Sequence, residues 1–208
     1  MASQTSTVYF GYGSNLWLQQ MRQRCPASKY LGVARLNNYK WIINDRGYAN
    51  VVELHSSSSD TSDATTQDYA HVVFGLVYSL QPSDESRLDK NEGVPHAYTK
   101  EYLACDFWAS EDGAKVDVDK KPTQTKDMLV YIDRKRVTDD EPKDEYVVRM
   151  NKGIDDAVVK GVPEKYVKDV MRKFIPAEDK GNAKRRSVEA KAYRQALEFV
   201  DENEERAV

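Results

Sequence analysis

Alternating and short apolar runs dominate the first two thirds of the chain, which is the pattern of β-strands. The run Val72–Leu80 is apolar over nearly its whole length and predicts a strand buried on both faces. Residues 98–108 alternate apolar and polar positions, which predicts a half-buried strand. The other predicted strands cover residues 7–10, 31–36, 39–43, 49–54 and 126–133. Asn-rich turns separate those at 31–36, 39–43 and 49–54 and favour a meander.

Spacings of three and four between apolar residues predict helices over most of the last third. One apolar stripe contains Val147, Met150, Ile154 and Ala157, and Gly161 and Pro163 separate it from a second helix around residues 166–174. Shorter helices are expected at 16–24 and 82–90, and a last one carries Val188, Ala192, Ala196 and Phe199. Strands first and helices mostly afterwards favour an α+β fold. We expect a main domain over residues 1–176 and a charged C-terminal helical extension over residues 177–208.

Composition narrows the classes of partner. The 208 residues carry a formal net charge of -3, with 31 basic and 34 acidic side chains, so there is no electrostatic footprint for nucleic acid or anionic membrane. No apolar run approaches the roughly 18 residues of a membrane span. Cys25 and Cys105 lie far apart in sequence, and neither a glycosylation sequon nor an N-terminal apolar region is present, so we expect a soluble protein of the reducing cytoplasm. The Ser-, Thr- and Asp-rich stretch at 56–68 predicts a surface loop without chemistry.

One stretch joins a predicted strand to a helical pattern through a glycine-rich turn, Gly11-Tyr12-Gly13-Ser14-Asn15. The glycines allow close approach of the backbone, and main-chain N–H groups at a helix start suit a carboxylate or phosphate. The alternative is an ordinary corner in which Ser14 or Asn15 caps the helix. Leu16 stands where a dinucleotide fingerprint needs glycine, and Tyr12 and Leu16 exclude a nucleophile elbow around Ser14.

A second stretch, residues 88–98, contains a candidate acid or base. Glu92 precedes Gly93, where a helix is expected to end. The negative end of the helix dipole and partial burial would both raise the pKa of this carboxylate toward the range of a general base. The alternative is a solvent-exposed glutamate at a helix end. Nearby His96 is expected at the surface, and the three histidines lack the neighbours that a zinc site needs.

Several blocks, taken in order, resemble the γ-glutamylcyclotransferase family. They are Tyr9-Phe10-Gly11-Tyr12-Gly13-Ser14-Asn15-Leu16 and the segments 33–40, 73–78 and 88–94. The segment from 146–153 to Gly161-Val162-Pro163 is similar as well. The resemblance covers about residues 8–176, and the ordered set is more specific than any single block.

The resemblance implies a small mixed β-barrel with flanking helices and an enzyme of the cytoplasm that releases 5-oxoproline from γ-glutamyl compounds. It implies no metal and no organic cofactor. The expected partner is a small-molecule γ-glutamyl substrate, with no nucleic acid and no membrane, and a homodimer is compatible with it. Glu92 matches the catalytic glutamate of the family. The positions that match its substrate-binding residues are Tyr9, Phe10, Gly11, Tyr12, Gly13, Ser14, Asn15, Tyr98, Tyr131 and Tyr146.

In the implied reaction the α-amine of the glutamyl group attacks its own γ-carbonyl, so the protein need only position the chain and move a proton. The turn would hold the α-carboxylate or donate to the oxyanion, and the sequence leaves both open. Two alternatives also remain. One is the same reaction on a larger glutathione-type conjugate, as in fungal secondary metabolism, and the other is a γ-glutamyl-binding protein without activity.

Overall fold

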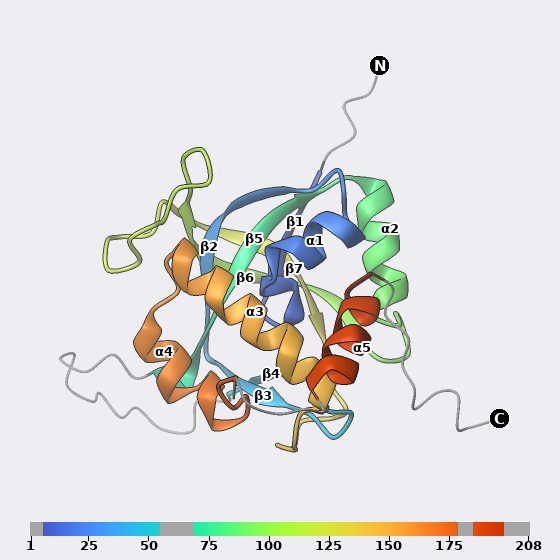
Figure 1. Ribbon diagram of the computed structural model, residues 1–208. Helices are drawn as coiled ribbons and strands as arrows, with labels where there is room; N and C mark the ends of the chain where they lie inside the picture. The colour runs from blue at the N-terminus through green and yellow to red at the C-terminus, as the bar shows by residue number, and fades with distance from the viewer. Residues whose placement is uncertain (1–5, 55–68, 179–184, 198–208) are drawn as a thin grey trace.

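A closed barrel of five strands forms the centre of the molecule in the computed structural model, which describes residues 6–54, 69–178 and 185–197. The strands are β1 (Thr7–Gly11), β2 (Lys29–Asn37), β5 (Val72–Leu80), β6 (Thr99–Ala109) and β7 (Gln124–Ile132), and their order around the barrel is β1-β5-β2-β6-β7 (Figure 1). The β1–β7 pair is parallel and the other pairs are antiparallel. The predicted α+β fold with a mixed barrel is therefore confirmed.

Burial along the strands follows the pattern of apolar residues. β5 pairs with β1 on one side and β2 on the other, and its residues from Val73 to Tyr78 are all buried. In β6, Cys105 and Phe107 are buried whereas Tyr102 is exposed, as the alternation predicts. The fully apolar strand thus lies inside the sheet, and the alternating strand has one face toward solvent.

The predicted meander is wrong. β3 (Tyr39–Ile43) and β4 (Ala49–Glu53) pair with each other in a separate two-stranded sheet, whereas β2 pairs with β5 and β6. Between β2 and β3, Asn38 has a φ of 63° and donates its main-chain N–H to the carbonyl of His71. This left-handed residue directs the chain out of the barrel instead of into a hairpin with β2. The predicted loop at 56–68 lies outside the described residues.

The helices cover the barrel on the side of the β1–α1 corner (Figure 1). The helices of the described residues are α1 (Leu18–Arg24), α2 (Pro82–Asn91), α3 (Asp144–Lys160), α4 (Glu164–Asp169) and α5 (Arg185–Leu197), with short 3₁₀ segments η1 (Ser14–Leu16), η2 (Tyr69–His71) and η3 (Met171–Lys173). α5 packs beside α3 and reaches α1, with Ala192 and Ala196 fully buried. Phe199, the last predicted apolar position, lies outside the described residues.

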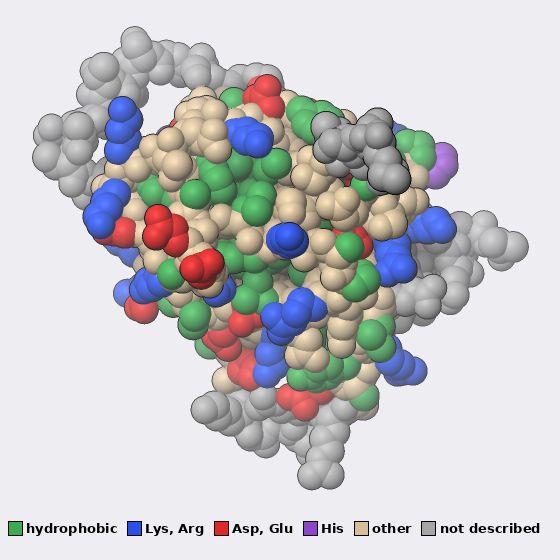
Figure 2. Space-filling model, turned by 90° about the horizontal axis from the view of Figure 1, so that it is seen from above, with side chains coloured by type: hydrophobic (Ala, Val, Ile, Leu, Met, Phe, Trp, Pro, Cys, Tyr) green, Lys and Arg blue, Asp and Glu red, His purple; other side chains and the backbone are tan. Residues whose placement is uncertain are grey.

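Charged side chains of both signs are interspersed over the face in Figure 2, around a patch of hydrophobic side chains. Cys25 and Cys105 are both free thiols and both buried. Among the helices that the structure describes, none combines the length and the apolar character needed to cross a bilayer.

Candidate active site

The turn after β1 differs from the predicted capped corner. A 3₁₀ turn, η1, intervenes, and α1 begins only at Leu18. The main-chain N–H of Leu18 donates to Asp156 Oδ2 of α3 at 2.8 Å, and neither Ser14 nor Asn15 caps a helix. The predicted capping role is therefore wrong, because both side chains take part in a buried hydrogen-bond network.

Ser14 joins the turn to α3 and to the β3–β4 sheet. Its hydroxyl accepts from Gln20 Nε2 at 2.9 Å and from Arg149 Nη1 at 3.0 Å. Its main-chain N–H donates to the hydroxyl oxygen of Tyr146 at 3.2 Å, and that oxygen also accepts the N–H of Ala49 at 3.2 Å. This N–H of the turn therefore binds a tyrosine, although the sequence suggested a ligand.

Asn15 connects the turn to the predicted base. Its Nδ2 donates to Glu92 Oε1 at 3.2 Å and to the hydroxyl of Tyr9 at 2.8 Å. Its Oδ1 accepts from Gln20 Nε2 at 2.8 Å and from Arg24 Nη1 at 3.4 Å. The amide has acceptors on its nitrogen side and donors on its oxygen side, which fixes its orientation, so its NH₂ group faces the Glu92 carboxylate.

Glu92 lies at the C-terminal end of α2, and Gly93 with a φ of 62° ends the helix there. The side chain is partly buried, which excludes the exposed alternative. Burial raises the pKa of the Glu92 carboxyl, while Arg24, the hydrogen bond from Asn15 and the more distant Arg149 oppose that rise. The predicted upward shift is confirmed, and its main cause is desolvation. Such a carboxylate can accept a proton and return it.

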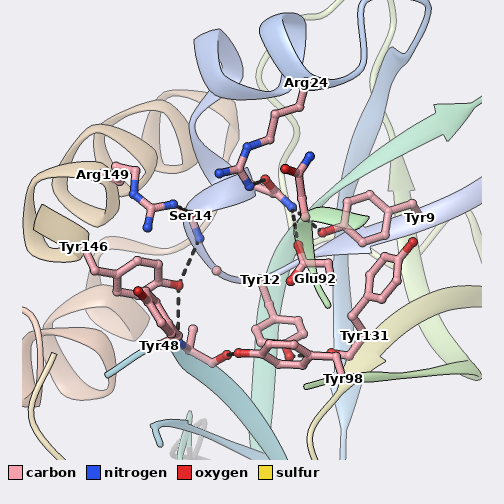
Figure 3. A pocket seen from close by; sticks show the side chains of 14 residues that line it. Tyr9, Tyr12, Ser14, Arg24, Tyr48, Glu92, Tyr98, Tyr131, Tyr146 and Arg149 are labelled. Atoms are coloured by element: carbon pink, nitrogen blue, oxygen red, sulfur yellow. Dashed lines mark hydrogen bonds between the residues drawn. The ribbon is translucent and has the colours of Figure 1, made fainter. Parts of the chain in front are cut away.

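Tyrosine side chains line the pocket in front of Glu92 (Figure 3). Tyr12 donates to the carbonyl of Tyr131 at 2.5 Å, and Tyr98 donates to the carbonyl of Ala49 at 3.0 Å. The Tyr131 hydroxyl donates to Asp89 Oδ1 at 2.7 Å, which fixes the side of the pocket formed by α2. Burial raises the pKa of Tyr12 and Tyr98 well above the ordinary value, so both remain neutral at pH 7.

The pocket is a small cavity of about 50 Å³ that is partly open to solvent. Most of the predicted site residues line it together: Tyr9, Tyr12, Gly13, Ser14, Asn15, Glu92, Tyr98, Tyr131 and Tyr146. Phe10 and Gly11 do not. Successive side chains on a strand face opposite ways, so Phe10 is fully buried in the core. Gly11 packs against Asn15 instead of lining the pocket: a Cβ added at Gly11 would lie 3.4 Å from the Cβ of Asn15.

Sequence reasoning missed five lining residues: Arg24, Tyr48, Ala49, Asn91 and Arg149. Arg149 is 1% exposed and pairs with the buried Glu145 at 2.9 Å. The signal for this pair was a Glu and an Arg four positions apart next to the apolar stripe of α3. Arg24 gave no such signal, because a basic residue in the last turn of a short helix ordinarily lies in solvent. Within the described ranges, no group of three or more His, Cys, Asp or Glu side chains could hold a metal ion.

Known proteins with similar sequences belong to the same family that the motifs resemble. No protein-family model matches the sequence. The chain is 30% identical to bovine γ-glutamylcyclotransferase over 89 residues, covering 43% of this chain and 45% of that protein. It is 29% identical to the human γ-glutamylcyclotransferase over 96 residues, again 43% and 45% of the two chains. The aligned part therefore spans less than half the length of these curated relatives.

Solved structures match over a larger part of the chain. A structure described as a γ-glutamyl cyclotransferase superposes with a TM-score of 0.60 at 18% identity and covers 91% of this chain and 99% of that one. An uncharacterized human protein gives a TM-score of 0.61 at 19% identity with the same coverage. At these identities the structures establish the fold. The chain thus resembles the γ-glutamylcyclotransferase family in sequence and has the fold of its members.

Proposed function

We propose that this protein is a γ-glutamylcyclotransferase that converts a γ-glutamyl compound into 5-oxoproline and a free amine. One observation carries the proposal: the Glu92 carboxylate lies in a tyrosine-lined pocket, where Nδ2 of Asn15 in the Tyr-Gly-Ser-Asn turn donates to its Oε1 at 3.2 Å. The partial similarity to curated γ-glutamylcyclotransferases supports the same activity.

The substrate supplies its own nucleophile. Glu92 takes a proton from the α-ammonium, and the freed amine attacks the γ-carbonyl to form the five-membered ring. As the tetrahedral intermediate collapses, the attacking nitrogen loses a second proton, and the departing nitrogen gains both protons, one of them from Glu92, and leaves as an ammonium group. One C–N bond forms, one breaks, and no water or oxidant is consumed, so the reaction needs no cofactor.

The remaining contribution of the protein is to hold the glutamyl chain folded, which removes much of the entropic barrier to ring closure. Tyr9, Tyr98, Tyr131 and Tyr146 would border the apolar part of that chain. Arg24 and Arg149 line the same pocket, and their positive charges favour an anionic group such as the α-carboxylate, while their guanidinium nitrogens bind groups of the protein. We propose the cytoplasm as the compartment, and the two free thiols are in keeping with it.

Glu92→Gln tests the proposal, because it keeps the shape and an acceptor for Asn15 but removes the base. We expect kcat for 5-oxoproline release from a γ-glutamyl dipeptide to fall by about 10²–10⁴-fold. The matched control is Glu85→Gln, seven residues earlier on α2, where the carboxylate binds Thr7 and Lys100 outside the pocket. The control should retain activity.

Two results would overturn the proposal. One is a Glu92→Gln enzyme with near wild-type turnover. The other is wild-type protein that binds γ-glutamyl compounds tightly but forms no 5-oxoproline, which would indicate a binding protein. A panel containing a γ-glutamyl dipeptide, glutathione and a bulky glutathione adduct identifies the preferred amine and distinguishes the larger-conjugate alternative.

A further inference from the structure

The C-terminal end of α5 lies against a residue of the pocket. Arg24 Nε donates to the carbonyl of Ala196 at 3.0 Å, and Arg24 Nη2 donates to the carbonyl of Gln195 at 2.5 Å. These carbonyls belong to the last described turn of α5. The guanidinium thus binds α5 across about 170 residues of the chain.

Arg24 is 4% exposed, and no carboxylate of the described residues lies within ion-pair distance of it. A buried guanidinium needs hydrogen-bond acceptors and a nearby negative charge. The end of α5 supplies two acceptors. The Glu92 carboxylate, which lines the same pocket, supplies the charge (Figure 3).

The third nitrogen of Arg24 continues this set of contacts into the site. Nη1 lies 3.4 Å from Asn15 Oδ1, and the NH₂ group of the same Asn15 amide donates to Glu92. The contacts therefore run from the carbonyls of α5 through Arg24 and Asn15 to the Glu92 carboxylate.

We propose that α5 is a working part of the active site, because its carbonyls at Gln195 and Ala196 hold the Arg24 guanidinium against Asn15, beside Glu92. Arg24 is then a positioning residue for the cyclotransferase reaction, and this inference rests on the function proposed above. In this proposal α5 affects the catalytic activity of a pocket whose lining residues all lie before position 150.

Close packing keeps α5 in this position. Ala192 and Ala196 are fully buried, and their small side chains allow the helix to approach its neighbours. Tyr193 packs edge-on against Trp17, with ring centroids 5.3 Å apart. A large side chain at position 196 would push the last turn of α5 away from Arg24.

The charges around Glu92 determine what loss of Arg24 should do. Positive groups face the carboxylate from three elements: Arg24 of α1, Arg149 of α3, and Arg46 of the β3–β4 turn. The neighbouring tyrosines Tyr9 and Tyr98 are neutral at the pH of interest because burial raises their pKa. Since Arg24 opposes the rise in the pKa of Glu92, removing its charge should raise that pKa further.

The experiment compares four variants of the full-length chain with wild type. Arg24→Gln removes the charge, Arg24→Lys keeps the charge but not the planar fork, and Ala196→Phe displaces the end of α5. Leu197→Ala is the matched control on the same helix, because Leu197 is 59% exposed. The readouts are the pH profile of kcat/KM for 5-oxoproline release and a ¹³C NMR titration of the Glu92 carboxyl, assigned with Glu92→Gln.

We expect the acid limb of the profile, and the Glu92 titration, to move up by about one pH unit in Arg24→Gln. Ala196→Phe should move the acid limb and the Glu92 titration in the same direction, while circular dichroism shows that the barrel is still folded. Arg24→Lys should give a smaller shift together with a lower kcat. Leu197→Ala should match wild type in both measurements. An unchanged titration in Arg24→Gln, or in an Ala196→Phe protein whose α5 amides exchange faster, would overturn the inference. If wild type releases no 5-oxoproline, the proposed function fails, while the NMR titration still decides this inference.

Discussion

Gly13 lies where the turn meets Tyr146, and its replacement by alanine gives a quantitative test of the site geometry. A Cβ at position 13 would be 2.8 Å from the Tyr146 hydroxyl oxygen and 3.3 Å from Ala49 Cβ. Gly13 has φ -105° and ψ -143°, outside the regions that alanine prefers. Part of the cost of Gly13→Ala should therefore come from the backbone conformation, and the rest should come from the contact with the hydroxyl and with Ala49.

The magnitude follows from what that hydroxyl does. It accepts the N–H of Ser14 and the N–H of Ala49, both at 3.2 Å. Pushing it away weakens two buried hydrogen bonds and overpacks the site, so Gly13→Ala should lower the free energy of unfolding by about 1–3 kcal/mol. Tyr146→Phe leaves both N–H groups unpaired and should cost about 2–4 kcal/mol.

The double variant Gly13→Ala/Tyr146→Phe separates this account from a general intolerance of alanine. Phenylalanine removes the clashing oxygen, so adding alanine should then cost less than it does when Tyr146 is present, and the cost of the backbone conformation cancels in the comparison. We expect a favourable coupling of about 1–2 kcal/mol between the two sites. Urea denaturation of the four proteins measures it. Additive costs would refute the assigned contact between Gly13 and the Tyr146 hydroxyl.

Three further predictions test the charges and the cap. Burial raises the pKa of Glu92 in the folded protein, so its favourable contribution to stability is present below the unfolded pKa and is lost as the pH rises through the folded pKa. Glu92→Gln should therefore unfold at higher urea than wild type at pH 7 and lose this advantage near pH 4, about the unfolded pKa. Arg149→Met leaves the 3% exposed Glu145 without its ion-pair partner and should cost about 3–5 kcal/mol in urea, part of which a second change, Glu145→Gln, should restore. Asp156→Ala removes the side-chain acceptor for the N–H of Leu18 and should lower the free energy of unfolding by about 0.5–2 kcal/mol without changing KM. A clear increase in KM would contradict a purely capping role.

Local patterns predicted the elements that depend on local chemistry. The apolar run of β5 and the alternation of β6 correspond to their burial, because each strand carries the side chains that its environment requires. The pairing of strands depends on contacts between distant residues, and the error over β2, β3 and β4 arose there. Asn37-Asn38 has the composition of a hairpin turn, but the N–H of Asn38 binds His71, more than 30 residues later.

In the site too, features set by neighbouring residues could be predicted and contacts between distant residues could not. The turn at Tyr12–Asn15 and the helix end at Glu92 are both local features, and the sequence placed both of them. A capping role for Ser14 and Asn15 was one of two interpretations of the turn, and it arose because local hydrogen bonds are the only ones visible from spacing. Gln20, Arg24 and Arg149 compete for the same oxygens in the folded protein, and their burial excludes the water that would otherwise serve as a partner.

Arg24 shows why this part of the site could not be found from the sequence. In α1, Gln20 and Arg24 are four residues apart and share one face, a polar face that ordinarily points to solvent. Here that face is buried because the turn, α3 and the end of α5 close over it, and the main-chain acceptors that stabilise Arg24 come from residues 195 and 196. Main-chain carbonyls carry no residue identity, so no motif in the sequence could encode this contact. Main-chain carbonyls carry only partial charges, so Arg24 keeps more of its positive charge than it would beside a carboxylate, and for this reason it can act on Glu92.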